Sequence, residues 1–230
     1  MKKRNLDPSI PKNFRPVSNL PYVSKIIEKV VASQLNEYLL QNHLCEPHQS
    51  AYRRSHSTET ALVHVMNNIL CSLGDRHAVL FVALDLSAAF DTVDYLLLES
   101  VLARLGIQGK AADWFKSYLG GREQQVIANR NISSCQQLSC GVPQGSVLGP
   151  LLFSLYSASL GKVLSDHGVQ YHFFADDTQL WLPFKPRNPE DAIAITQKCL
   201  DDVVLWMSHY RLKLIVEKNR ISCDLIKEPC

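Results

Sequence analysis

Two short segments, LDLSAAFD at residues 84–91 and FADD at residues 174–177, decide how this chain is interpreted. Each places an aspartate, Asp85 or Asp176, at the end of an apolar run that is typical of a β-strand. Mg²⁺ prefers oxygen ligands, usually one or two carboxylates together with substrate phosphates. We therefore expect the two carboxylates to lie within a few ångströms of each other at the rim of one sheet, as in a two-metal centre for phosphoryl or nucleotidyl transfer.

Simpler structural roles remain open for each aspartate. Asp85 would also serve as a helix cap, and an Asp-Asp pair such as residues 176–177 is common in turns. The same dipeptide recurs at residues 201–202 on an amphipathic helical pattern, where it predicts only a solvated face. The pair in FADD differs because a strand-like segment, residues 171–174, precedes it.

The rest of the chain predicts a mixture of helices and strands. Apolar residues at three- and four-residue spacing predict helices over about residues 23–39, 57–74, 97–105 and 189–210, and apolar runs predict strands over 78–86, 169–174 and 178–182, with a hairpin across 122–140. The elements do not alternate in βαβ order, which favours an α+β fold with an antiparallel sheet backed by helices. The apolar stripes of the first two helices are expected to be buried.

Composition narrows the class of protein. The 230 residues carry a net charge of only +2, but residues 1–60 hold nine Lys/Arg against five Asp/Glu, so the N-terminal part is the more basic. The seven cysteines include no CxxC pair, which argues against a zinc site. Their odd number and the lack of a secretory signal predict a reducing intracellular compartment, nucleus or cytoplasm. No apolar run approaches the ~20 residues that span a bilayer, so no membrane partner is expected.

Five motifs in a fixed order resemble a known family. LDLSAAFDTVD, GVPQGSVLGP and FADDTQL, preceded by FRPVSNL and QSAYR, resemble the reverse transcriptase domain of a non-LTR retrotransposon of the long interspersed element type, over about residues 13–218. The resemblance implies the fingers and palm of a right-hand polymerase, with the thumb missing or truncated. It implies a fingers-like part at residues 1–77, a palm at 78–218 and a degenerate tail at 219–230.

The resemblance also implies the catalytic residues. Asp85, Asp176 and Asp177 would be catalytic, with Asp85 and Asp176 as the main metal pair and Asp177 as a helper. Asp85, Leu86, Asp176 and Asp177 would bind two Mg²⁺ ions, with Mn²⁺ as the alternative metal.

Substrate-binding residues follow from the same resemblance. Phe90 would be the steric gate that excludes a 2′-hydroxyl, whereas its pattern alone fits a core phenylalanine. Gln144 would touch the incoming nucleotide and Gly145 would let the template approach, whereas turn chemistry alone also explains the Pro-Gln-Gly segment.

Two cations complete the implied site. Arg15 would bind the triphosphate through its fork of donors, with a solvated arginine as the alternative. Lys218 would protonate the leaving pyrophosphate. Here the sequence departs from the family pattern, which usually has Asn where Ile215 stands and Thr where Asn219 stands.

The expected function is RNA-directed DNA polymerisation, in which deoxynucleoside triphosphates extend a DNA primer on an RNA template. The alternative is a catalytically impaired, domesticated or truncated remnant that binds nucleic acid or another partner. A different two-metal enzyme on an unrelated fold is a third hypothesis, against which the Pro-Gln-Gly segment argues.

Overall fold

The computed structural model describes residues 17–53, 55–87, 89–128, 131–214 and 224–226. Its helices are α1 (Tyr22–Gln41), α2 (Thr58–Gly74), the 3₁₀ turn η2 (Ala89–Asp91), α3 (Tyr95–Arg104), α4 (Gly109–Leu119), α5 (Leu148–Ser157), α6 (Leu160–Asp166) and α7 (Pro189–His209). Its strands are β1 (Ala78–Leu84), β2 (Leu86–Ser87), β3 (Glu123–Gln124), β4 (Ile127–Ala128), β5 (Asn131–Ile132), β6 (Gln136–Gln137), β7 (Gln170–Phe174), β8 (Asp177–Phe184), β9 (Lys213–Leu214) and β10 (Asp224–Ile226).

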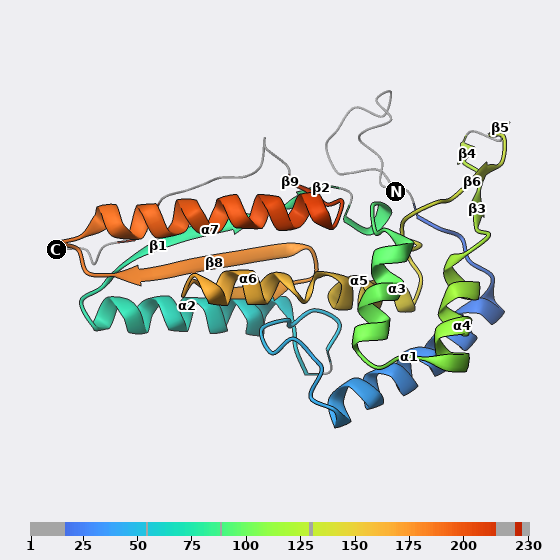
Figure 1. The fold of residues 1–230 in the computed structure, drawn as a ribbon, viewed down its shortest axis with the longest axis horizontal. Helices are drawn as coiled ribbons and strands as arrows, with labels where there is room; N and C mark the ends of the chain where they lie inside the picture. Colours follow the sequence, from blue (N-terminus) through green and yellow to red (C-terminus); the bar gives the residue numbers. More distant parts are fainter. Residues whose placement is uncertain (1–16, 54, 88, 129–130, 215–223, 227–230) are drawn as a thin grey trace.

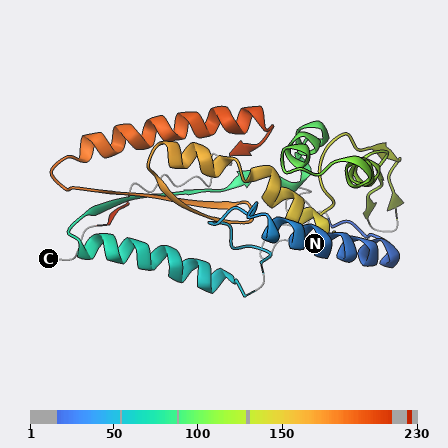
Figure 2. The same ribbon diagram turned by 60° about the horizontal axis from the view of Figure 1, so that its bottom comes forward.

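An antiparallel sheet in the order β10-β1-β8-β7 forms the centre of the molecule. Helix α2 covers one face of this sheet, and α6 and α7 cover the other (Figures 1 and 2). Helices α1, α3, α4 and α5 gather beyond the end of the sheet where β8 begins (Figure 1). The expected α+β architecture is therefore confirmed.

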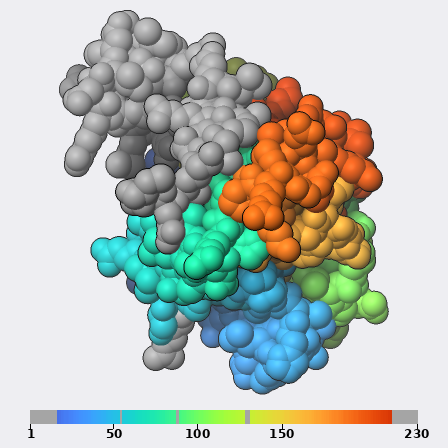
Figure 3. All heavy atoms as spheres, turned by 90° about the vertical axis from the view of Figure 1, so that its left-hand side faces the viewer, coloured from blue at the N-terminus to red at the C-terminus, as the bar shows by residue number. Residues whose placement is uncertain are grey.

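Burial on both faces explains the continuous apolar run of β1. Val79 packs with Val65 and Trp181 beneath α2, whereas Leu80 and Val82 belong to the larger core on the other side. Successive strand side chains point to opposite faces, so a strand between two helical layers needs apolar residues at every position. Figure 3 shows the end of the molecule opposite the start of β8, where the turn from α2 to β1 and the start of α7 both reach the surface.

The apolar stripes of the first two helices are only partly buried, which corrects the expectation. On α1 the buried positions are Glu28, Ala32, Leu35 and Leu39, while Ile26 and Val30 are exposed. On α2, Leu62 and Leu70 are likewise exposed. Periodicity identifies the helix and its apolar side, but which part of that side is covered depends on the neighbours that the fold supplies.

Two further elements lie outside the sequence-based expectations. Helix α6 connects α5 to β7, and β10, within the segment expected to be a degenerate tail, pairs with β1 so that Val79 lies opposite Ile226. The predicted hairpin across residues 122–140 is present as two short ladders, β3 with β6 and β4 with β5. Among the helices of the described part, none is both long and apolar enough to cross a membrane.

Candidate active site

The register of the sheet brings the two aspartate segments to one end. The last residue of β1, Leu84, lies opposite Thr178 of β8, and Asp85 follows it directly. Across the β7–β8 hairpin, Phe174 lies opposite Asp177. The structure therefore places Asp85 beside the hairpin turn that carries the other two aspartates. Asp85 and Asp176 are half-buried there, whereas Asp177 is exposed.

A two-residue turn, Ala175-Asp176, joins β7 to β8. Ala175 has φ = 58°, which is the left-handed region that usually selects glycine at the first position of such a turn. A left-handed conformation costs an alanine about 1–2 kcal/mol. Ala175 is also buried, so its surroundings must hold this conformation.

The segment around Gln49 runs beside β7 and holds the turn. The Ser50 N–H donates to the Phe173 carbonyl at 3.0 Å, and the Phe173 N–H donates to the His48 carbonyl at 2.9 Å. The buried Gln49 side chain accepts from the Ala175 N–H at 3.1 Å through its Oε1 atom. The segment belongs to the QSAYR motif, but Gln49 was not among the predicted site residues. A contact across 126 residues leaves no local signal in the sequence.

Tyr52, on the same loop, lies close enough to Asp176 for the charge of that carboxylate to affect its hydroxyl group. Desolvation of its hydroxyl group, and then the negative charge of Asp176, raise the pKa of Tyr52, although 59% of the residue is exposed. Tyr52 also has φ = 60°, an uncommon value for a bulky residue. An exposed aromatic ring is thus held close to one of the candidate metal ligands.

The donors at this end of the sheet suit a hard divalent cation. Asp85 and Asp176 offer carboxylate oxygens, and the residues that the structure describes contain no cluster of three or more His, Cys, Asp and Glu arranged to hold a metal. Mg²⁺ commonly binds one or two carboxylates and completes its shell with water and substrate phosphates. Two carboxylates are therefore a sufficient protein contribution to such a site. The Leu86 side chain is buried, so only its main chain is available to an ion.

Phe90, within the first aspartate segment, joins this segment to the Pro-Gln-Gly loop. Its carbonyl accepts from the Val142 N–H at 2.8 Å. Its half-buried ring tilts against the fully buried ring of Phe153, with centroids 4.9 Å apart. Phe90 therefore combines one packed face with partial exposure, which leaves both the gate and the core interpretation open.

The Pro-Gln-Gly turn lies against the start of the described chain. The Ser18 N–H donates to the Gln144 carbonyl at 2.9 Å. Gly145 is exposed with φ = 101°, a conformation that glycine adopts readily. The structure thus brings residues 17–18 to the turn that contains two predicted substrate contacts. Arg15 and Lys218, the remaining predicted contacts, lie outside the described residues.

A buried glutamate fixes the helix that follows this turn. Glu28 of α1 is 1% exposed, and its Oε2 accepts from the Val147 N–H at 2.7 Å and the Leu148 N–H at 3.1 Å. Both donors belong to the N-terminus of α5, where unpaired N–H groups and the helix dipole favour a carboxylate. This role was not predicted, because Glu28 stands inside an apolar stripe of the sequence.

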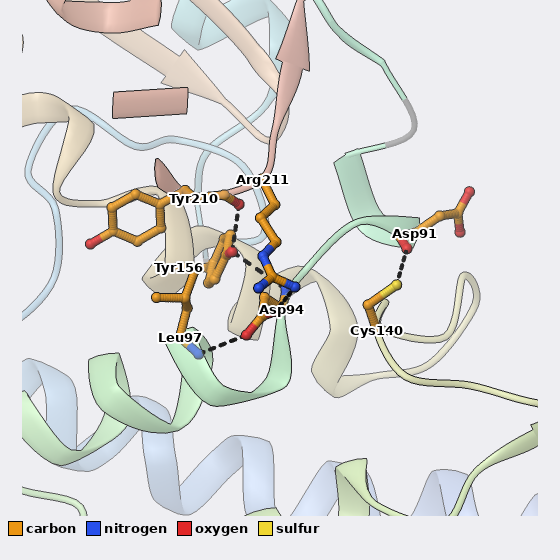
Figure 4. A network of polar contacts seen from close by, with 7 residues as sticks. All are labelled: Asp91, Asp94, Leu97, Cys140, Tyr156, Tyr210 and Arg211. Atoms are coloured by element: carbon orange, nitrogen blue, oxygen red, sulfur yellow. Dashed lines mark hydrogen bonds and ion pairs between the residues drawn. The ribbon is translucent and has the colours of Figure 1, made fainter. Parts of the chain in front are cut away.

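Figure 4 shows a second polar network that fixes the end of the first aspartate segment. Asp94 caps α3 by accepting from the Leu97 N–H at 3.0 Å and pairs with Arg211 at 2.7 Å. Tyr156 donates to the carbonyl of Tyr210 at 2.6 Å. The network joins the residues after Phe90 to α5 and to the junction of α7 and β9.

Comparisons with known proteins show the family of the chain. A family model described as reverse transcriptase (RNA-dependent DNA polymerase) matches residues 1–228. The probable RNA-directed DNA polymerases from transposon BS and from transposon X-element of Drosophila melanogaster are each 30% identical over 222 residues, covering 94% of this chain and 24% of the relative. This chain thus spans about a quarter of the length of these relatives.

Solved structures share the fold at much lower identity. Telomerase from Candida Tropicalis in complex with a TWJ fragment of telomeric RNA superimposes with a TM-score of 0.62 at 12% identity, covering 86% of this chain and 33% of that one. The apo telomerase from the same organism gives 0.61 at 12% identity, covering 83% and 36%. These matches confirm the expected fingers and palm fold.

Proposed function

Because the chain belongs to the reverse transcriptase (RNA-dependent DNA polymerase) family, we propose that it is an RNA-directed DNA polymerase domain. Its substrates are deoxynucleoside triphosphates and a DNA primer paired to an RNA template. The observation that carries the proposal is the sheet register, which brings Asp85 to the hairpin turn that carries Asp176. We assign residues 1–77 to the fingers-like part and 78–218 to the palm.

Asp85 and Asp176 are the residues proposed to hold two Mg²⁺ ions, with Asp177 in support and Leu86 as a main-chain contact. The ions, when bound, supply the Lewis acidity that lowers the pKa of the primer 3′-hydroxyl and stabilises the leaving pyrophosphate. The two half-buried carboxylates at one sheet end are suited to binding cations in a defined place, because strand ends move less than a free loop.

Phe90, Gln144 and Gly145 are proposed to receive the incoming nucleotide. The Phe90 carbonyl and the Val142 N–H join the aspartate segment to the Pro-Gln-Gly loop, so the three residues lie on one connected backbone frame. Gly145 is exposed and carries no side chain, so it is the residue proposed to let a template strand approach. Arg15 and Lys218 remain proposed contacts of the triphosphate and the pyrophosphate, respectively.

Primer extension by the purified chain tests this function. With Mg²⁺, an RNA template and a DNA primer, the wild-type chain should add deoxynucleotides, and Asp85→Asn should abolish the addition without changing the thermal melt. Asp201→Asn, an exposed aspartate of α7, is the matched control and should extend normally. Extension by Asp85→Asn at the wild-type rate would contradict the proposal.

An interaction role is the second candidate, and the exposed apolar residues of α1 favour it. Tyr22 and Val23 are 79% and 64% exposed, and Ile26, Ile27 and Val30 lie on the same helix with large exposed surfaces. Contiguous apolar surface of this kind marks an interaction site. A chain that binds primer–template but adds no nucleotide under any Mg²⁺ or Mn²⁺ condition would favour this second function.

A further inference from the structure

The turn that carries Asp176 depends on an alanine in a conformation that alanine disfavours. Ala175 is buried and left-handed at φ = 58°. Glycine would adopt this conformation without a steric penalty, but alanine needs outside support. Because Asp176 is the next residue, the direction of its carboxylate depends on what holds Ala175.

Gln49 supplies that support through both polar atoms of its amide. Its Oε1 accepts from the Ala175 N–H at 3.1 Å, and its Nε2 donates a long bond of 3.5 Å to the Ala175 carbonyl. The same Oε1 accepts from the Ala51 N–H at 2.9 Å. The side chain is 5% exposed, so these hydrogen bonds compete little with water.

The backbone that carries Gln49 is itself fixed. Its N–H donates to the Glu46 carbonyl at 3.2 Å, and its two neighbours exchange hydrogen bonds with Phe173 of β7. The amide therefore starts from one anchored segment and reaches the turn two residues beyond Phe173. This arrangement leaves the side chain little freedom to release Ala175.

We propose that Gln49 is a positioning residue of the nucleotidyl-transfer site, which holds Ala175 left-handed and thereby directs the Asp176 carboxylate to the metal position. The inference rests on the proposed function. Gln49 touches neither substrate nor ion in this role. It acts through the peptide groups on either side of Ala175.

Gln49→Met tests the role by keeping length and removing the amide. We expect kcat to fall roughly 10–100-fold and the Mg²⁺ concentration for half-maximal extension to rise severalfold, while KM for the nucleotide stays within about threefold. Ser50→Ala, at the neighbouring buried position, is the matched control and should extend like the wild type. Gln49→Asn, whose shorter amide cannot reach both N–H groups, is a milder second variant with the same expected pattern.

A second substitution that restores activity distinguishes a positioning role of Gln49 from a general loss of stability. Glycine adopts the left-handed conformation without support, so the double variant Gln49→Met/Ala175→Gly should recover most of the lost kcat and the normal Mg²⁺ requirement. Loss of activity that follows the melting temperature and is not rescued by glycine would overturn the proposal. Wild-type kcat and Mg²⁺ dependence in Gln49→Met and Gln49→Asn would overturn it equally.

Amide hydrogen exchange provides a readout that needs no activity. The Ala175 and Ala51 N–H groups should be protected in the wild type and in Ser50→Ala, and should exchange at least tenfold faster in Gln49→Met. If the wild type fails to extend primers while this pattern is seen, the proposed function fails and the contact stands. Unchanged exchange in Gln49→Met would show that Gln49 does not hold the turn, whatever the polymerase activity.

Discussion

The chain contains the dipeptide Asp-Asp twice, and the two copies lie in different surroundings. Residues 176–177 span the turn and first position of a hairpin, next to Asp85 at the end of the sheet. Residues 201–202 lie within α7, whose buried side consists of Ala192, Thr196, Cys199, Val203 and Met207. Asp201 is exposed, and Asp202 pairs with His167 at 2.7 Å.

The difference lies in the backbone and not in the residue type. On α7, Asp201 projects from a regular helix into solvent, where its charge is screened, and the half-buried Asp202 is satisfied by His167. In the hairpin, the buried Gln49 makes hydrogen bonds to the left-handed Ala175 of the turn, and a second aspartate segment approaches from β1. The metal site is therefore proposed for residues 176–177, where a second carboxylate segment meets the pair at the end of the sheet, and not for residues 201–202.

The largest expected effect comes from replacing a carboxylate by an amide, once in each Asp-Asp pair. Asp176→Asn should reduce Mg²⁺-dependent extension by at least 100-fold, because it removes a charged ligand while keeping the side-chain volume. Asp202→Asn should leave the extension rate unchanged within about twofold. Both variants should melt within a few degrees of the wild type, which shows that the loss is chemical and not structural. Equal rates for the two variants would remove the distinction between the pairs.

The second effect concerns two histidines in contrasting surroundings, one that pairs with an aspartate of α7 and one on β7, the strand that leads into the hairpin turn. His167 contacts Asp202, whereas His172 of β7 is buried, and neither of its ring nitrogens has a hydrogen-bond partner among the described residues. Desolvation, and then the positive charges of His64, His48 and His56, lower the pKa of His172 to about 4 from 6.5.

The sign of the resulting pH dependence follows from proton uptake. Between pH 6.5 and about 4 the unfolded chain binds a proton at His172 that the folded chain does not, so stability falls as the pH is lowered through this window. The free energy of unfolding should fall by about 3 kcal/mol once the pH lies below both pKa values. Urea unfolding of the wild type and of His172→Phe at pH 7.5 and 4.5 measures it. The phenylalanine variant should lose less stability on acidification, and equal losses would contradict the prediction.

Asp94 provides a further contrast, because its contacts stabilise the fold and lie outside the proposed metal site (Figure 4). Asp94 is buried, caps α3 and pairs with the exposed Arg211. Asp94→Ala should lower the free energy of unfolding by about 2 kcal/mol, most of it from the lost cap and the smaller part from a pair that solvent screens. Asp94→Asn retains the cap and loses only the ion pair, so it should cost clearly less than half as much. Urea unfolding distinguishes the two, and equal losses would assign the effect to the ion pair.

A substitution of Phe90 tests whether this residue discriminates between ribonucleotides and deoxyribonucleotides. Phe90→Val should increase ribonucleotide incorporation severalfold and cost about 1 kcal/mol of stability, because only part of the ring is packed against Phe153. Incorporation of each nucleotide type and urea unfolding provide the two readouts. Unchanged sugar selectivity with a loss above about 3 kcal/mol would make Phe90 a core residue.

Local patterns in the sequence predicted the parts of the molecule that depend on local chemistry. The apolar run of β1 and the amphipathic pattern of α7 are encoded by neighbouring residues, so the solvated character of Asp201 followed from periodicity. The motif order in addition predicted the family and its fold. The roles of Gln49 and Glu28 could not be predicted, because each acts on a backbone more than 100 residues away. The exposed stripe of α1 was missed for the same reason, since periodicity does not report what covers a face.

The smallest expected effect is the contribution of the contact between Asp202 and His167 to the free energy of unfolding. Asp202 is 44% exposed at its side chain and His167 is 14% exposed, so solvent screens their attraction and their coupling energy should be about 0.5 kcal/mol. A double-mutant cycle of Asp202→Ala and His167→Ala, followed by urea unfolding at pH 6, measures it. Primer extension by Asp202→Ala should match the wild type, in contrast to any substitution of Asp176. A coupling energy above about 2 kcal/mol would show that the contact between Asp202 and His167 stabilises the fold specifically. Asp202 would then have a structural role, in contrast to the catalytic role proposed for Asp176.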